Sequence, residues 1–204
     1  MSRLRLVLAF AVKYRDRGIA GIGLADDRFE AARFAPAFER AKAEGLGSVP
    51  HAGEHTGAES IRAALETLGA DRIRHGIRAV DDPGLVRELA GRGTVLDVCP
   101  ISNVRTRVVA SLADHPLRQL AEAGVRCSIS TDDPAMFDTD LTRDYEAAAS
   151  LGVLPEASYE AGLAGALCDT GTKERLGEVG KSFDWSTTTA TLVAMGTEDS
   201  HGAG

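Results

Sequence analysis

The sequence has no block of basic residues, no cysteine pair at metal-binding or redox spacing, and no apolar run long enough to span a membrane. Its 204 residues carry a net charge of −7, which argues against nucleic acid as a partner because polyanion binding relies on clustered lysine and arginine. The three cysteines lie in apolar segments, as reduced thiols of a cytoplasmic protein do. We therefore expect a cytoplasmic protein without nucleic-acid or membrane partners.

The two ends of the chain differ in character from the rest. Residues 1–12 are basic and then apolar, but the apolar run is short and leads into a charged segment without a cleavage pattern. A buried strand that runs into a helix is the favoured interpretation there. Residues 181–204 are rich in serine, threonine and glycine, which predicts a disordered tail after a single domain over residues 1–180.

Between these ends, short β-like runs alternate with helical patterns, and the runs begin about every 25 residues. A helix start is marked by Asp82–Pro83, and stops are marked by glycines such as Gly45 and Gly69. This rhythm predicts a parallel sheet covered by helices. The expected strands are residues 4–8, 19–25, 46–51, 72–75, 94–99 and 125–130.

Two α/β architectures fit such a rhythm, an open doubly wound sheet and a closed TIM (β/α)8-type barrel. A dinucleotide-binding sheet requires a glycine-rich turn after a strand, and Gly21-Ile22-Gly23 lies inside a strand and lacks the third glycine. In a barrel, the chemistry gathers where the strands end. We therefore examine the residues at those ends.

Polar side chains follow several of the expected strands. His51 and Glu54 follow one, His75 the next, and Asp132 and Asp133 the last. Each has a simple alternative explanation, since His75 could be a turn or core histidine and Asp133 could cap a helix. Parallel strands, however, bring all these ends to one rim, and histidines with carboxylates on a rim indicate a metal-dependent hydrolase.

The same segments resemble the adenosine deaminase family of metal-dependent hydrolases. The matching motifs are HAGE at 51–54, HG at 75–76, CPISN at 99–103 and STDDP at 130–134, and the resemblance covers about residues 19–170. It implies a zinc enzyme that hydrolyses adenosine, a small purine nucleoside, to inosine and ammonia. Adenine or another aminopurine nucleoside derivative is the alternative substrate.

By this resemblance, His51 and Asp132 would be ligands of one zinc ion. Glu54 would shuttle a proton to the purine ring, and His75 would orient and stabilise the attacking hydroxide. Burial raises a carboxyl pKa, which would keep Glu54 protonated as an acid.

Further positions follow from the same resemblance. Asp133 would hydrogen-bond the purine, and Asp26 stands at the substrate where the family has a glycine whose backbone meets the purine. Ser102 and Asn103 are assigned a supporting role. The sequence context of His115, which precedes a proline at a helix start, predicts a structural role for it.

The chain also departs from the family pattern. The family begins its barrel with a strand ending in HxH, which supplies two more zinc ligands, and this sequence contains no HxH. The first two barrel strands are therefore expected to be missing, and zinc binding to be weak or absent. The chain could be a fragment, a degenerate paralogue that binds purines or serves as an interaction module, or a protein completed by a partner.

Overall fold

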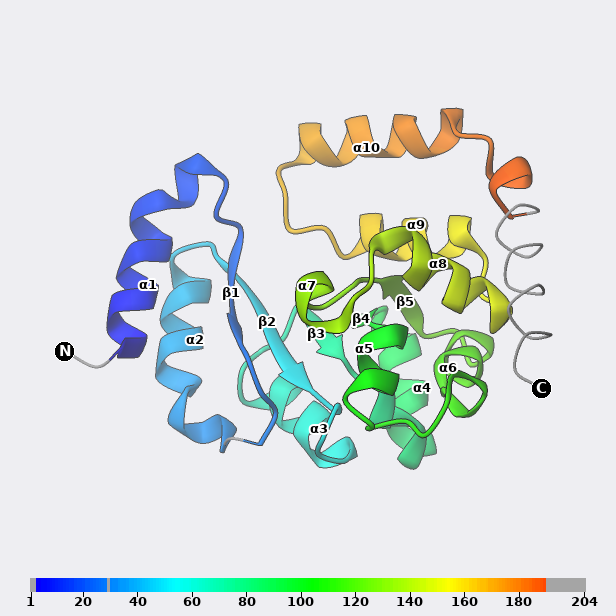
Figure 1. Cartoon of the computed structure of the whole chain (residues 1–204). Helices are drawn as coiled ribbons and strands as arrows, with labels where there is room; N and C mark the ends of the chain where they lie inside the picture. Colours follow the sequence, from blue (N-terminus) through cyan, green and yellow to red (C-terminus); the bar gives the residue numbers. More distant parts are fainter. Residues whose placement is uncertain (1–2, 29, 190–204) are drawn as a thin grey trace.

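The structure, a computed structural model, describes residues 3–28 and 30–189 and forms a five-stranded sheet flanked by helices (Figure 1). The strands are β1 (Gly21–Leu24), β2 (Gly47–Ala52), β3 (Arg72–His75), β4 (Val95–Val98) and β5 (Arg126–Ile129). The α-helices are α1 (Arg3–Tyr14), α2 (Ala35–Ala43), α3 (Ala58–Glu66), α4 (Pro83–Arg92), α5 (Pro100–Arg105), α6 (Leu117–Glu122), α7 (Pro134–Phe137), α8 (Leu141–Ser150), α9 (Pro155–Ala164) and α10 (Thr170–Ser182). Short 3-10 helices are η1 (Arg15–Arg17), η2 (Ala31–Arg33), η3 (Ile77–Asp81) and η4 (Leu112–Asp114).

All neighbouring strands are parallel, and they lie across the sheet in chain order from β1 to β5. A doubly wound sheet reverses its strand order at a switch point, whereas a barrel adds strands in one direction. The unbroken order therefore confirms the predicted α/β class as part of a (β/α)8-type barrel. It also places the carboxyl ends of all five strands at the same edge.

The outer face of the sheet is the main hydrophobic core. Ile73 of β3, Leu96 of β4 and Cys127 of β5 point to this face and are at most 5% exposed. Apolar residues of α3, α4 and α6 pack against them, as their helical spacing predicts. These helical residues are Ile61, Leu65, Leu85, Leu89, Leu117 and Leu120.

A second, smaller core joins β1 to the helices beside it. Ile22 of β1 packs with Phe38 and Ala41 of α2 and with Ala11 of α1. In Figure 1, α1 and α2 accordingly lie next to each other along the outer side of β1. These contacts attach the first two helices to the edge of the sheet.

The strand expected at residues 4–8 is wrong, because this segment lies within helix α1. The apolar run continues to Val12 without glycine or proline, so its length suits a helix better than a strand. Leu8, Ala11 and Val12 then form one face, which packs on the Phe38 cluster. Only five strands are present in the described chain, where two missing barrel strands would have left six.

Helix α9 covers part of the inner face of the sheet, opposite α3, α4 and α6. Gly162 of α9 lies against Ser128, and a Cβ at Gly165 would be 2.8 Å from a Val95 methyl carbon. Between α9 and β1 a cavity of about 800 Å³ remains, and His51 is one of the residues that line it. In the part of the chain that the structure describes, the inner face is thus covered by a helix on one side and open on the other.

The ends of several elements match their sequence signals. Asp82 caps α4 by accepting hydrogen bonds from the backbone N–H groups of Gly84 and Leu85.

The predicted tail boundary at 181 falls inside α10, and Trp185 beyond it donates a hydrogen bond to the Gly180 carbonyl. The remainder of that predicted tail, from 190 onwards, lies outside the described residues. None of the described helices is both long and apolar enough to cross a membrane.

Candidate active site

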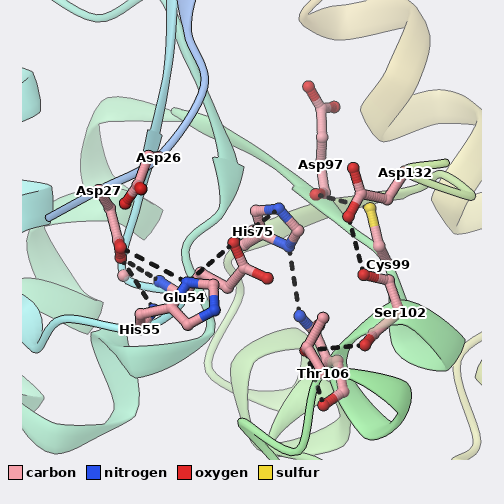
Figure 2. Close-up of polar contacts among 12 residues, drawn as sticks. Asp26, Asp27, Glu54, His55, His75, Asp97, Cys99, Ser102, Thr106 and Asp132 are labelled. Carbon is pink, nitrogen blue, oxygen red and sulfur yellow. Dashed lines mark hydrogen bonds and ion pairs between the residues drawn. The ribbon is translucent and has the colours of Figure 1, made fainter. Parts of the chain in front are cut away.

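The turn after β2 brings His51 and Glu54 to the carboxyl edge of the sheet. Between them, Gly53 has a φ of +65°, and a Cβ there would lie 2.4 Å from Ile61. Both the backbone conformation and the close approach therefore require glycine at this position. The turn also depends on Asp27, whose Oδ2 accepts hydrogen bonds from the backbone N–H groups of residues 54, 55 and 56 at 2.7, 3.0 and 3.0 Å. Figure 2 shows these bonds reaching across from Asp27.

Three side chains from three strand ends form a cluster able to hold a metal ion. His51 comes from β2, His75 from the end of β3 and Asp132 from the segment after β5, and one ligand atom of each lies within 4.8 Å of the others. The Nδ1 atom of His51 is buried and has no hydrogen-bond partner. A buried imidazole nitrogen with a free position, beside a second imidazole and a carboxylate, fits a divalent metal such as zinc.

The backbone is strained at two of these positions. His75 has a φ of +64° and Asp132 a φ of +61°, in the left-handed region that residues other than glycine rarely adopt. Such conformations are held in place by the surrounding structure and concentrate at functional sites. Ser102 of α5 supplies part of that support, since its hydroxyl donates a hydrogen bond of 2.8 Å to Oδ2 of Asp132 (Figure 2).

Glu54 faces the histidines from the other side of the cluster. Its Oε2 lies 3.3 Å from Nε2 of His75 and 3.3 Å from Nδ1 of His55. Burial raises the pKa of Glu54 to about 7, so the carboxyl group can carry a proton near neutral pH. Burial also lowers the pKa of His75 to about 4 and lowers the pKa of His51, which favours neutral imidazoles at both positions.

The two positions predicted to bind substrate lie outside this cluster. Asp26 has a φ of +118°, and its carboxylate binds the Arg28 guanidinium at 2.7 Å, which lowers the pKa of Asp26 to about 2. Asp133 is exposed and caps α7 by accepting a hydrogen bond of 2.9 Å from the backbone N–H of Met136. Substrate contact by either residue stays a prediction.

Two contacts that support the site, one made by Asp27 and one by His115, were not predicted from the sequence. The side chain of Asp27 is fully buried and anchors the Glu54 turn, and none of the sequence motifs includes it. The signal that could have found it is an acidic residue three positions after the end of β1. His115 was placed at a helix start, yet its Nε2 lies 3.1 Å from Oδ1 of Asn103, which in turn contacts His75. No sequence pattern reports such a contact between distant segments.

The chain is similar in sequence to known deaminases. A family model described as adenosine deaminase matches residues 2–178. The aminodeoxyfutalosine deaminase of Acidothermus cellulolyticus is 50% identical over 198 residues, which cover 91% of this chain and 54% of that protein. An adenine deaminase of Sinorhizobium fredii is 42% identical over 173 residues, which cover 82% of this chain and 53% of that protein.

A solved structure shows the same arrangement of strands and helices. The adenine deaminase from Arthrobacter aurescens matches with a TM-score of 0.75 and 31% identity, covering 85% of this chain and 57% of that one. The chain thus spans about half the length of the curated relatives it matches.

Proposed function

The chain belongs to the adenosine deaminase family, and we propose that it carries the metal-binding and proton-transferring part of an enzyme that removes the 6-amino group of a purine by hydrolysis. The observation that supports this proposal is the convergence of three segments onto one site, which bring together His51 and Glu54, His75, and Asp132. A buried carboxyl group with a pKa of about 7 beside a metal-ligand cluster has the features of a hydrolytic centre.

In this proposal, His51 and Asp132 would hold one zinc ion, and zinc at this position would supply the Lewis acidity that makes water a nucleophile at neutral pH. Glu54 would donate a proton to a ring nitrogen of the purine as water adds to the carbon that bears the amino group. The water would give up two protons, one that restores protonated Glu54 and one that leaves with the amino group as ammonia when the C–N bond breaks. His75 hydrogen-bonds the attacking oxygen. Ser102 keeps the Asp132 carboxylate oriented through its 2.8 Å hydrogen bond.

We assign substrate contacts to Asp133 and Asp26, at the edge of the site. Asp133 would accept a hydrogen bond from the purine, and Asp26 stands where the family has glycine. The Asp26 carboxylate binds Arg28. The side chain of Asp26 would occupy space beside the purine base that a glycine leaves free. Adenosine is the substrate that the family resemblance suggests, while the relatives above are named for aminodeoxyfutalosine and adenine.

The experiment measures ammonia release by the purified chain with added zinc from each of these three substrates. Turnover of one substrate that Glu54→Gln reduces by about 10²–10⁴-fold is the expected result, because this is the typical contribution of a general acid. Turnover that survives Glu54→Gln unchanged would contradict the assignment of Glu54.

A second function, a non-catalytic purine-binding module, is favoured by one specific observation. Of the cluster in the described residues, the roles given above leave two zinc ligands, His51 and Asp132, and the sequence contains no HxH that could add to them. In that case zinc binding would be weak and the three substrates would bind without turnover. Equilibrium dialysis with labelled adenosine, run alongside the ammonia assay, distinguishes binding without hydrolysis from no binding.

A further inference from the structure

Behind His75, on the side away from Glu54, a row of buried polar side chains leads away from the site. His75, Asn103 and His115 are at most 4% exposed. Nδ1 of His75 lies 3.2 Å from Nδ2 of Asn103, and Oδ1 of Asn103 lies 3.1 Å from Nε2 of His115. The row ends at the backbone of α6, where the Leu117 N–H donates a hydrogen bond of 3.1 Å to Nδ1 of His115.

The direction of every hydrogen bond in this row follows from its last member. A backbone N–H can only donate, so Nδ1 of His115 has no proton and Nε2 of His115 carries one. That Nε2–H donates to Asn103, which must therefore present its carbonyl oxygen to His115 and its amide to His75. Nδ1 of His75 then accepts, and the ring proton of neutral His75 is on Nε2.

We propose that His115 and Asn103 are positioning residues that hold His75 in the Nε2–H tautomer, so that His75 donates a hydrogen bond into the site and does not bind the metal. Nε2 of His75 is the atom that lies 3.3 Å from Oε2 of Glu54. An imidazole nitrogen that carries a proton has no lone pair for a metal ion. His51 and Asp132 are then the ligands that this cluster offers.

The tautomer of His75 does not depend on whether the protein deaminates purines, but the role of His75 in orienting an attacking oxygen rests on the proposed function. A donor fixed at Nε2 can orient an attacking oxygen, whereas a ligand at the same atom would occupy it. The hydrogen-bond row thus decides between two possible roles of His75, a hydrogen-bond donor to the attacking oxygen and a metal ligand. It also explains why a histidine, rather than an apolar residue, is buried at the start of α6, 12 residues beyond Asn103.

Nitrogen-15 NMR on the metal-free chain tests the tautomer directly. Two-bond proton–nitrogen correlations distinguish protonated from unprotonated ring nitrogens in each of the five histidines. We expect unprotonated Nδ1 in both His75 and His115. Asn103 is the one asparagine of the sequence, so selective labelling gives a single side-chain amide, with one proton shifted downfield by its bond to His75. A protonated Nδ1 in His75 would overturn the proposal.

Asn103→Asp changes the direction of the row while keeping the size of the side chain. A carboxylate can only accept, so it requires a proton on Nδ1 of His75 and frees the lone pair of Nε2 toward His51 and Asp132. We expect the NMR signature of His75 to invert and the zinc affinity to rise by about tenfold or more. Unchanged ring signals together with unchanged zinc affinity would contradict the proposal.

Thr106→Val is the matched control, because Thr106 lies next to α5 and its hydroxyl donates only to backbone carbonyls of residues 102 and 103. It should leave the ring signals and the zinc affinity as in the wild type. If Asn103→Asp does not fold, the wild-type NMR result still decides the tautomer. Loss of ammonia release from every substrate with the expected tautomer present would refute the proposed function and leave this inference intact.

Discussion

Asp27→Asn tests whether one buried carboxylate organises the turn that carries Glu54. In the wild type, Oδ2 of Asp27 accepts three backbone hydrogen bonds and a fourth, of 2.9 Å, from the Thr56 hydroxyl. An amide oxygen can accept the same bonds, but without charge each is weaker by about 1 kcal/mol, so the four together lose about 3–4 kcal/mol. We expect urea titrations to show a decrease of this size in the free energy of unfolding.

The matched control is Asp81→Asn, which removes the charge of an exposed carboxylate. Asp81 pairs with Arg78 at 2.8 Å, and its side chain is 41% exposed, so solvent screens the interaction. The free energy of unfolding should change by no more than about 0.5 kcal/mol. If Asp27→Asn also costs less than about 1 kcal/mol, the four hydrogen bonds do not hold the turn as described, and the reasoning fails.

Three further substitutions test other parts of the structure. The pKa of Glu54 is raised from 4.5 to about 7, so in the metal-free chain the stability that the protonated carboxyl contributes is lost as pH rises through about 7. The urea midpoint of the wild type should therefore be lower at about pH 8 than at about pH 5. Glu54→Gln should remove this difference. Ser102→Ala removes the hydrogen bond to Asp132 and should weaken zinc binding by about 10–100-fold in a competition titration. Leu96→Ala opens a cavity in the core of the outer face, where Leu96 is 0% exposed, and should lower the free energy of unfolding by about 2–5 kcal/mol.

Much of the sheet could be predicted because its strands and helices carry local signals. The glycines after the helices and the cap at Asp82 mark boundaries that the structure confirms. Residues 4–8 were predicted as a strand but belong to helix α1. Apolar residues occur on both the exposed and the buried side of this helix, so the sequence shows no clear helical periodicity of hydrophobic residues. Leu6, Val7 and Phe10 are all more than half exposed, so only packing against α2 shows which face of α1 is buried.

The candidate site shows the same division between local and distant information. The placement of His51, His75 and Asp132 at strand ends could be predicted, because parallel strands bring their carboxyl ends together. The contact of Asp27 with the turn after β2 links segments 27–29 residues apart. The row through Asn103 of α5 joins the end of β3 to the residues before α6. Such contacts depend on tertiary packing, which motif spacing does not report.

The position of α9 could not be anticipated from its sequence either. Its alanine and glycine content predicts a helix but not the surface on which it packs. In the structure, Gly162 and Gly165 allow close contact with Ser128 and Val95 on the inner face of the sheet. Which residues of a strand face α9 depends on the register of the strands, since neighbouring residues such as Val95 and Leu96 point to opposite sides of the sheet.

Zinc binding by equilibrium dialysis, compared between the wild type, His51→Ala and Glu54→Gln, tests most directly whether the strand ends form a metal centre. His51 offers a buried nitrogen without a partner to the cluster, whereas Glu54 is placed to move protons. The expected result is one weak but saturable zinc site in the wild type, its loss in His51→Ala and its retention in Glu54→Gln. Zinc binding that survives His51→Ala, or no saturable binding by the wild type, would contradict a metal centre at this edge of the sheet.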